Sequence, residues 1–163
     1  METINFKIVS FDCKGFKYRM YDYVNKLFQS CDFLLLQEHW LLSSEFSNFT
    51  KYVTGASYCA NTDMPHDRLV PGRPYGGAAI LWHNNLNCKV DIINSLSGRL
   101  SSVLVGNGGR QFLFRSVYMP CYRLKLWTCL WWCISWNFAY IQHAHGRQPN
   151  YYGWLEYWLC ETQ

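Results

Sequence analysis

The stretch at residues 31–42, CDFLLLQEHWLL, decides the fold of this chain. The run 33–36 within it is wholly apolar and lies between polar residues. So short an apolar run is typical of a strand buried on both faces. Glu38 and His39 follow at once. Charge at the end of a buried strand is costly unless it has a partner, so this position often marks a site, and a solvated carboxylate is the competing interpretation.

Length and composition favour one folded domain. The chain has 163 residues and a mass of 19.3 kDa, enough to bury a core. Charged residues make up 16% and aromatic residues 18%, which excludes a disordered composition. The formal charge of +4 permits a nucleic-acid partner but does not argue for one, because there is no basic run.

The cysteines and the first residues indicate an intracellular protein. The eight cysteines have no spacing typical of a disulfide framework. Residues 1–11 lack the basic segment and apolar segment of a signal peptide, so none is expected. Reduced thiols are the simplest interpretation.

The first forty residues predict a strand, a helix and a second strand. Residues 6–11 alternate and are rich in strand formers, and 18–29 place apolar residues at helical spacing. With the strand at 33–37, this order predicts two parallel neighbours covered by a helix. Asp12 and Glu38 then lie at the carboxyl ends of adjacent strands, where open α/β sheets usually place their sites.

The next eighty residues predict mainly antiparallel strands. A helical turn is expected at 41–49, and a long loop with three prolines at 61–74. Gly106 to Gly109 predict a hairpin turn. The expected strands are 51–58, 78–82, 89–93, 100–105 and 112–118.

The character of the sequence changes after Cys121. The last 42 residues contain six of the eight tryptophans and only five charged residues. Their apolar residues follow neither a helical nor a strand period for more than one turn. Because core segments of evolved proteins are locally consistent with one structure, we expect 122–163 to be an unrelated tail, frame-shifted or mis-spliced, and poorly packed.

Five motifs in order carry a resemblance to a known family. They are IVSFDCKGF, CDFLLLQEHWL, GRPYGGAAILW, GRLSSVLV and FLFRSVYMP. Together they resemble the amino-terminal half of the endonuclease/exonuclease/phosphatase family, and more narrowly the abasic-site-like endonuclease domain encoded by non-LTR retrotransposons. The resemblance covers residues 4–121, and its strength lies in the ordered set.

The resemblance implies a fold and an activity. The family is an α/β, four-layer αββα sandwich with two sheets flanked by helices. It hydrolyses phosphoesters with a divalent cation, usually Mg²⁺, which prefers carboxylate and phosphate oxygens. A retroelement domain of this type would nick its DNA integration target, so DNA is the expected partner and the nucleus the expected location.

The resemblance also implies site residues. Glu38 matches the metal-binding glutamate, and Tyr118 matches a tyrosine near the scissile phosphate. Asp12 stands where the family has asparagine; it is a second candidate metal ligand that would also repel phosphate. The candidate catalytic residues are therefore Glu38, Tyr118 and Asp12, and the candidate metal ligands are Glu38 and Asp12. The pair Gly76-Gly77 matches glycines whose role is backbone geometry.

A larger departure concerns activity. The family's Gly-Asp-Phe-Asn and Ser-Asp-His motifs, which supply the acid/base groups and the catalytic histidine, do not occur in this sequence. We therefore expect a truncated domain with little or no catalysis. A non-catalytic remnant that binds DNA or protein is the alternative, and a membrane-associated product through the apolar segment 124–141 is the second.

Other polar residues are weaker candidates. Cys129, Cys133, His143 and His145 could be taken as a zinc set, but the two histidines have only one residue between them. His66 and His83 are expected to be ordinary loop and strand-end histidines.

Overall fold

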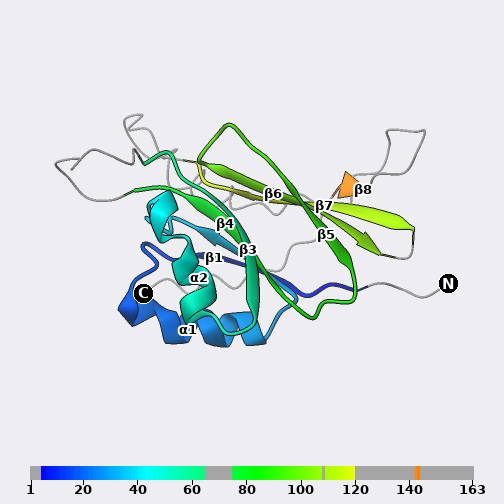
Figure 1. Cartoon of the computed structure of the whole chain (residues 1–163), viewed down its shortest axis with the longest axis horizontal. Helices are drawn as coiled ribbons and strands as arrows, with labels where there is room; N and C mark the ends of the chain where they lie inside the picture. The colour runs from blue at the N-terminus through cyan, green and yellow to red at the C-terminus, as the bar shows by residue number, and fades with distance from the viewer. Residues whose placement is uncertain (1–4, 65–74, 108, 120–141, 144–163) are drawn as a thin grey trace, which may run out of the picture.

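The computed structural model describes residues 5–64, 75–107, 109–119 and 142–143, and two four-stranded sheets lie within them (Figure 1). The first sheet has the order β1 (Ile8–Asp12), β2 (Phe33–Gln37), β4 (Ala78–His83) and β3 (Ala56–Asn61). The second has the order β5 (Lys89–Ile93), β6 (Leu100–Asn107), β7 (Arg110–Val117) and β8 (Gln142–His143). The helices are α1 (Tyr18–Gln29), η1 (Ser43–Glu45) and α2 (Ser47–Tyr52).

The predicted strand–helix–strand unit is confirmed. Strands β1 and β2 are parallel neighbours, and α1 connects them. The register pairs Asp12 with Gln37, so both strands end at the same level of the sheet. Strand β4 then pairs antiparallel with the other side of β2, which leaves all five β2 residues buried. This burial is the physical reason for the uninterrupted apolar run at 33–36.

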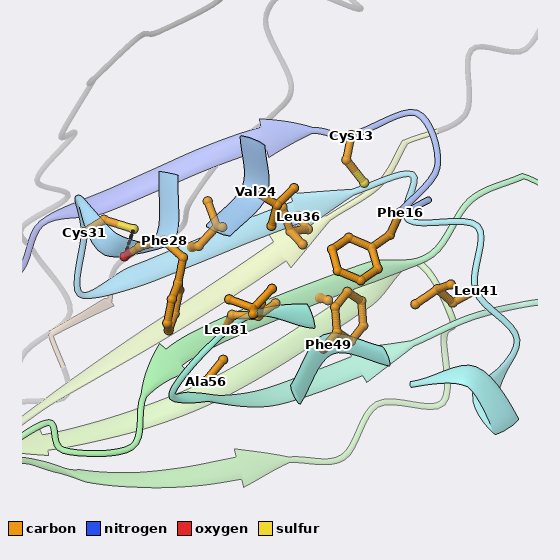
Figure 2. Packing of buried hydrophobic residues seen from close by; sticks show 13 residues of the cluster. Cys13, Phe16, Val24, Phe28, Cys31, Leu36, Leu41, Phe49, Ala56 and Leu81 are labelled. Carbon is orange, nitrogen blue, oxygen red and sulfur yellow. Dashed lines mark hydrogen bonds between the residues drawn. The ribbon is translucent and has the colours of Figure 1, made fainter. Parts of the chain in front are cut away.

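Helices α1 and α2 cover the outer face of the first sheet. Val24 and Phe28 of α1 are completely buried, as is Phe49 of α2. They pack with Leu34 and Leu36 on the face of β2 that lies away from the second sheet. Figure 2 shows these helical side chains pointing at the sheet, with Cys13 and Phe16 at one end of the cluster and Phe28 and Cys31 at the other.

A second core joins the two sheets. Phe33 and Leu35 point to the opposite face of β2 and pack with Ile80, Val103 and Phe114. Each fully buried side chain of this size contributes about 1.5–3 kcal/mol of hydrophobic free energy. The described residues thus form three layers: helices, the first sheet and the second sheet.

Several predicted boundaries need correction. The predicted strand 51–58 is wrong at its start, because Lys51 and Tyr52 end α2 and β3 begins at Ala56. Burial of Phe49 and Val53 against the core explains why this segment is helical despite its strand-forming residues. The first strand was predicted at 6–11 and lies at Ile8–Asp12. Strand β4 lies in the first sheet, between β2 and β3. The hairpin β6–β7 pairs as predicted.

Other predictions fall largely outside the described residues. These are the nature of the tail 122–163, the apolar segment 124–141, His66 and the proposed zinc set; for His143 the structure gives only its place in β8. Among the helices that the structure describes, none is long and apolar enough to cross a membrane. Among the described residues, the thiols of Cys13, Cys31, Cys59 and Cys88 are free.

Candidate metal and phosphate site

Asp12 and Glu38 lie together at the ends of β1 and β2. The register places Asp12 beside Gln37, and Glu38 is the next residue. Burial raises the pKa of the Asp12 carboxyl, and the charge of Glu38 raises it further. The backbone N–H of Lys14 donates to Asp12 Oδ1 at 3.2 Å, and this bond and the Lys14 charge act in the opposite direction. Two neighbouring carboxylates supply the hard oxygen donors that suit a divalent cation.

A left-handed turn presents the Glu38 side chain. Glu38 has φ +53° and Trp40 has φ +58°, a conformation that costs a residue with a side chain about 1–2 kcal/mol. The Glu38 carbonyl accepts a 2.7 Å bond from Gly15 N–H, and the His39 carbonyl accepts a 2.8 Å bond from Phe16 N–H. The loop after β1 therefore holds the turn from one side.

The glycine pair before β4 holds the turn from the other side. The carbonyl of Gly77 accepts from Glu38 N–H at 2.9 Å, and that of Gly76 accepts from Trp40 N–H at 3.1 Å. Gly76 and Gly77 have φ of +72° and +88°. A Cβ on Gly77 would overlap the ring of His39. The pair thus serves backbone geometry, in agreement with the prediction.

His39 is a structural side chain rather than a free base. It is completely buried and touches Phe46 and Phe49 edge-on. Its Nδ1 accepts from Leu41 N–H at 3.0 Å, so Nε2 carries the proton and donates to the Asn61 carbonyl at 3.1 Å. Burial lowers the pKa of His39 to about 4, which keeps the ring neutral.

Tyr118 reaches the site from the second sheet. It follows β7, and its backbone N–H donates to the Arg99 carbonyl at 2.8 Å. Its hydroxyl donates a hydrogen bond to the Glu38 carboxylate. Burial, this bond and the charges of Glu38 and Asp12 raise the pKa of Tyr118 to about 12. The three predicted site residues are therefore brought together by two sheets.

A buried polar link ties the sheets directly beneath the carboxylates. Gln37 Nε2 donates to Ser116 Oγ at 3.0 Å, and Ser116 Oγ donates to the Leu36 carbonyl at 3.0 Å. Ser10 Oγ donates to Gln37 Oε1 at 3.3 Å. Gln37 and Ser116 are almost fully buried, so each polar atom needs the partner it has. This link fixes the strand end from which Glu38 projects.

The described residues place no third metal-ligating side chain beside Asp12 and Glu38. No group of three or more histidine, cysteine or carboxylate side chains able to hold a metal is found among them. His83 bonds the carbonyls of Phe28 and Cys31, at the opposite end of β2, about 17 Å from Glu38. Asp63 is occupied by Gly98 N–H and the Arg99 guanidinium.

Sequence reasoning missed the residues that support the site. Gln37 and Ser116 are 79 positions apart, and their contact depends on the packing of the two sheets. One signal was present: Gln37 is the only polar residue of β2. A polar side chain at the end of a strand buried on both faces needs a buried partner.

Comparison with known proteins agrees with this architecture. No protein-family model and no curated protein matches the chain. Among solved structures, the chain is similar to the AP endonuclease LMAP from Leishmania major, with a TM-score of 0.52 and 16% sequence identity. The fold is of the endonuclease/exonuclease/phosphatase type. The alignment covers 71% of this chain and 40% of the endonuclease. This chain therefore spans less than half the length of that endonuclease.

Proposed function

We propose that this chain is the amino-terminal half of a retrotransposon-type, metal-dependent DNA endonuclease domain that retains part of a metal and phosphate site and does not cleave DNA. The observation that carries the proposal is the meeting of Asp12, Glu38 and Tyr118 at one edge of two packed sheets. The ordered family motifs support the retrotransposon origin, and the likeness to an AP endonuclease structure supports the fold on which it rests.

The site would hold a divalent cation between the carboxylates of Asp12 and Glu38. Such a cation, usually Mg²⁺, supplies charge stabilisation to a phosphate. The Tyr118 hydroxyl is a donor beside the same carboxylate and could turn to a phosphate oxygen. With only two protein carboxylates, metal binding should be weak and should improve when a phosphodiester completes the ligands.

The described residues contain no side chain placed to act as the general base for DNA cleavage. Hydrolysis needs a group that orients or deprotonates water. Both ring nitrogens of His39 are committed to backbone partners, and His83 lies at the far end of the sheet. The extra negative charge of Asp12, where the family has asparagine, opposes phosphate approach. Misplacement of a catalytic group by about 1 Å can already cost ~10²-fold, and the described residues position no base at all, so we expect no meaningful rate.

Mn²⁺ binding, measured through the effect of the bound ion on water proton relaxation, tests the metal site. The whole protein should bind Mn²⁺, and Glu38→Gln should weaken that binding at least fivefold. Glu45→Gln is the matched control, because Glu45 only caps a short helix through Leu42 N–H at 2.9 Å. Equal Mn²⁺ binding by the wild type and Glu38→Gln would refute the assignment.

A further inference from the structure

Three exposed aromatic or apolar side chains belong to the segments that border the carboxylates. Tyr18 is 86% exposed, Tyr75 is 49% exposed and Met119 is 57% exposed. Two of them are chain neighbours of residues that form or support the site: Tyr75 precedes Gly76, whose carbonyl accepts from Trp40 N–H, and Met119 follows Tyr118. Large apolar side chains on a surface are costly to leave in water, and a cluster of them at one edge marks an interaction site.

Tyr18 lies at the same edge because of how α1 begins. The loop that leads into α1 is bonded to the Glu38 turn through Gly15 N–H and Phe16 N–H. Helix α1 therefore starts at the carboxyl ends of β1 and β2 and runs away from them (Figure 1). Tyr18 is the first residue of this helix.

Two lysines lie in the loop that leads to Tyr18. Lys14 and Lys17 are exposed, and Lys17 Nζ lies 5.4 Å from the ring centroid of Trp40, two residues beyond Glu38. The salt bridges within the described part of the chain involve Lys89 and Arg99, and neither Lys14 nor Lys17 takes part in them. We call Lys14, Lys17, Tyr18 and Tyr75 the aromatic–cation rim.

We propose that the aromatic–cation rim binds a DNA strand whose bases are unpaired, with phosphates on the lysines and base faces on the tyrosines. This rests on the proposed function, which supplies a phosphate site at the centre of the rim. Aromatic rings interleaved with cations suit a chain of flat apolar bases joined by anions. The faces of bases are accessible in single strands and hidden in a stacked duplex. The rim therefore favours unpaired over paired DNA.

Fluorescence anisotropy of the whole protein in EDTA tests the proposal without metal or cleavage. The probes are a labelled oligothymidylate of about 10 nucleotides, a length within the range that single-strand sites occupy, and a hairpin duplex of equal charge. The oligothymidylate should bind more tightly. Tyr18→Ala and Tyr75→Ala should each weaken its binding about fivefold or more. Lys17→Gln should lower the slope of log affinity against log salt by about 0.7.

Helix α1 supplies matched controls. Tyr23 is 40% exposed and Lys26 is exposed, and both lie further along the same helix, with Lys26 about 12 Å from Tyr18 along the axis. Tyr23→Ala and Lys26→Gln should leave binding within twofold of the wild type.

Three results would overturn the proposal: equal or tighter binding of the duplex, no effect of Tyr18→Ala and Tyr75→Ala, or equal losses in the control variants. Failure of the proposed function looks different. If Mn²⁺ binding is absent while the oligothymidylate result holds, the rim stands without the metal site. If Mn²⁺ binds at Glu38 and the probes bind equally, the metal site stands without the rim.

Discussion

The hydroxyl of Tyr118 donates a hydrogen bond to the carboxylate of Glu38. The two residues follow β7 and β2, which belong to different sheets. The bond therefore forms only when the two sheets are packed as described. Asp12, the third residue of the site, comes from a third strand, β1. A site assembled from three strand ends is rigid only if those strand ends are held, and the polar contacts beneath the site do this.

Gly77→Ala should destabilise the protein more than Gly55→Ala. Both glycines have positive φ, +88° and +76°, so each substitution incurs the backbone cost of about 1 kcal/mol. A Cβ on Gly77 also overlaps the His39 ring, whereas nothing lies within 4 Å of a Cβ on Gly55. Urea unfolding should show an additional loss of ~1–3 kcal/mol for Gly77→Ala. Equal losses would show that His39 does not pack against Gly77.

Ser116→Ala should cost about 1–3 kcal/mol, because it leaves the buried Nε2 of Gln37 without its hydrogen-bond acceptor. Ser10→Ala is the comparison, since Ser10 is half-buried and its bond to Gln37 is longer, at 3.3 Å. We expect it to cost less than ~1 kcal/mol in the same unfolding experiment. Indistinguishable losses for the two serines would contradict the buried link.

Asp12→Asn should stabilise the metal-free protein at pH 7. Burial and Glu38 raise the pKa of Asp12, so its charged form is disfavoured in the folded state. Because Asp12 is half-buried and partly screened, we expect a gain below about 1 kcal/mol. Added Mg²⁺ should then raise the melting temperature of the wild type more than that of Asp12→Asn. Thermal unfolding with and without Mg²⁺ measures both effects, and an equal response to Mg²⁺ argues against Asp12 as a ligand.

The buried thiol of Cys31 should make the protein sensitive to alkali. Burial raises the pKa of Cys31 to about 12 from its ordinary 9.0. Between these values the unfolded chain releases a proton that the folded chain keeps, so stability is full below pH 9 and falls as the pH rises towards 12. Cys31→Ala should remove this part of the pH dependence. If the free energy of unfolding falls equally with pH above pH 9 in the wild type and in Cys31→Ala, this prediction is wrong.

The sequence predicted the local elements well where one pattern dominated. Helix α1 and strand β2 have the predicted bounds, since α1 buries Val24 and Phe28 at helical spacing and β2 is apolar on both faces. The segment around Lys51 was harder, because its strand formers are overridden by the burial of Phe49 and Val53.

The site was only partly predictable. Chain order placed Asp12 and Glu38 at neighbouring strand ends. The left-handed conformation of Glu38 depends on bonds to Gly15 and Gly77, which are distant in the sequence, so no local propensity encodes it. The link between Gln37 and Ser116 arises in the same way from sheet packing.

The nicking of supercoiled plasmid DNA in Mg²⁺ tests the central claim most directly, using protein already shown to bind Mn²⁺. We expect the wild type and Glu38→Gln to leave the plasmid equally supercoiled, because no described residue supplies the base that hydrolysis needs. Nicking by the wild type that Glu38→Gln abolishes would contradict the account and show that the domain is catalytically complete.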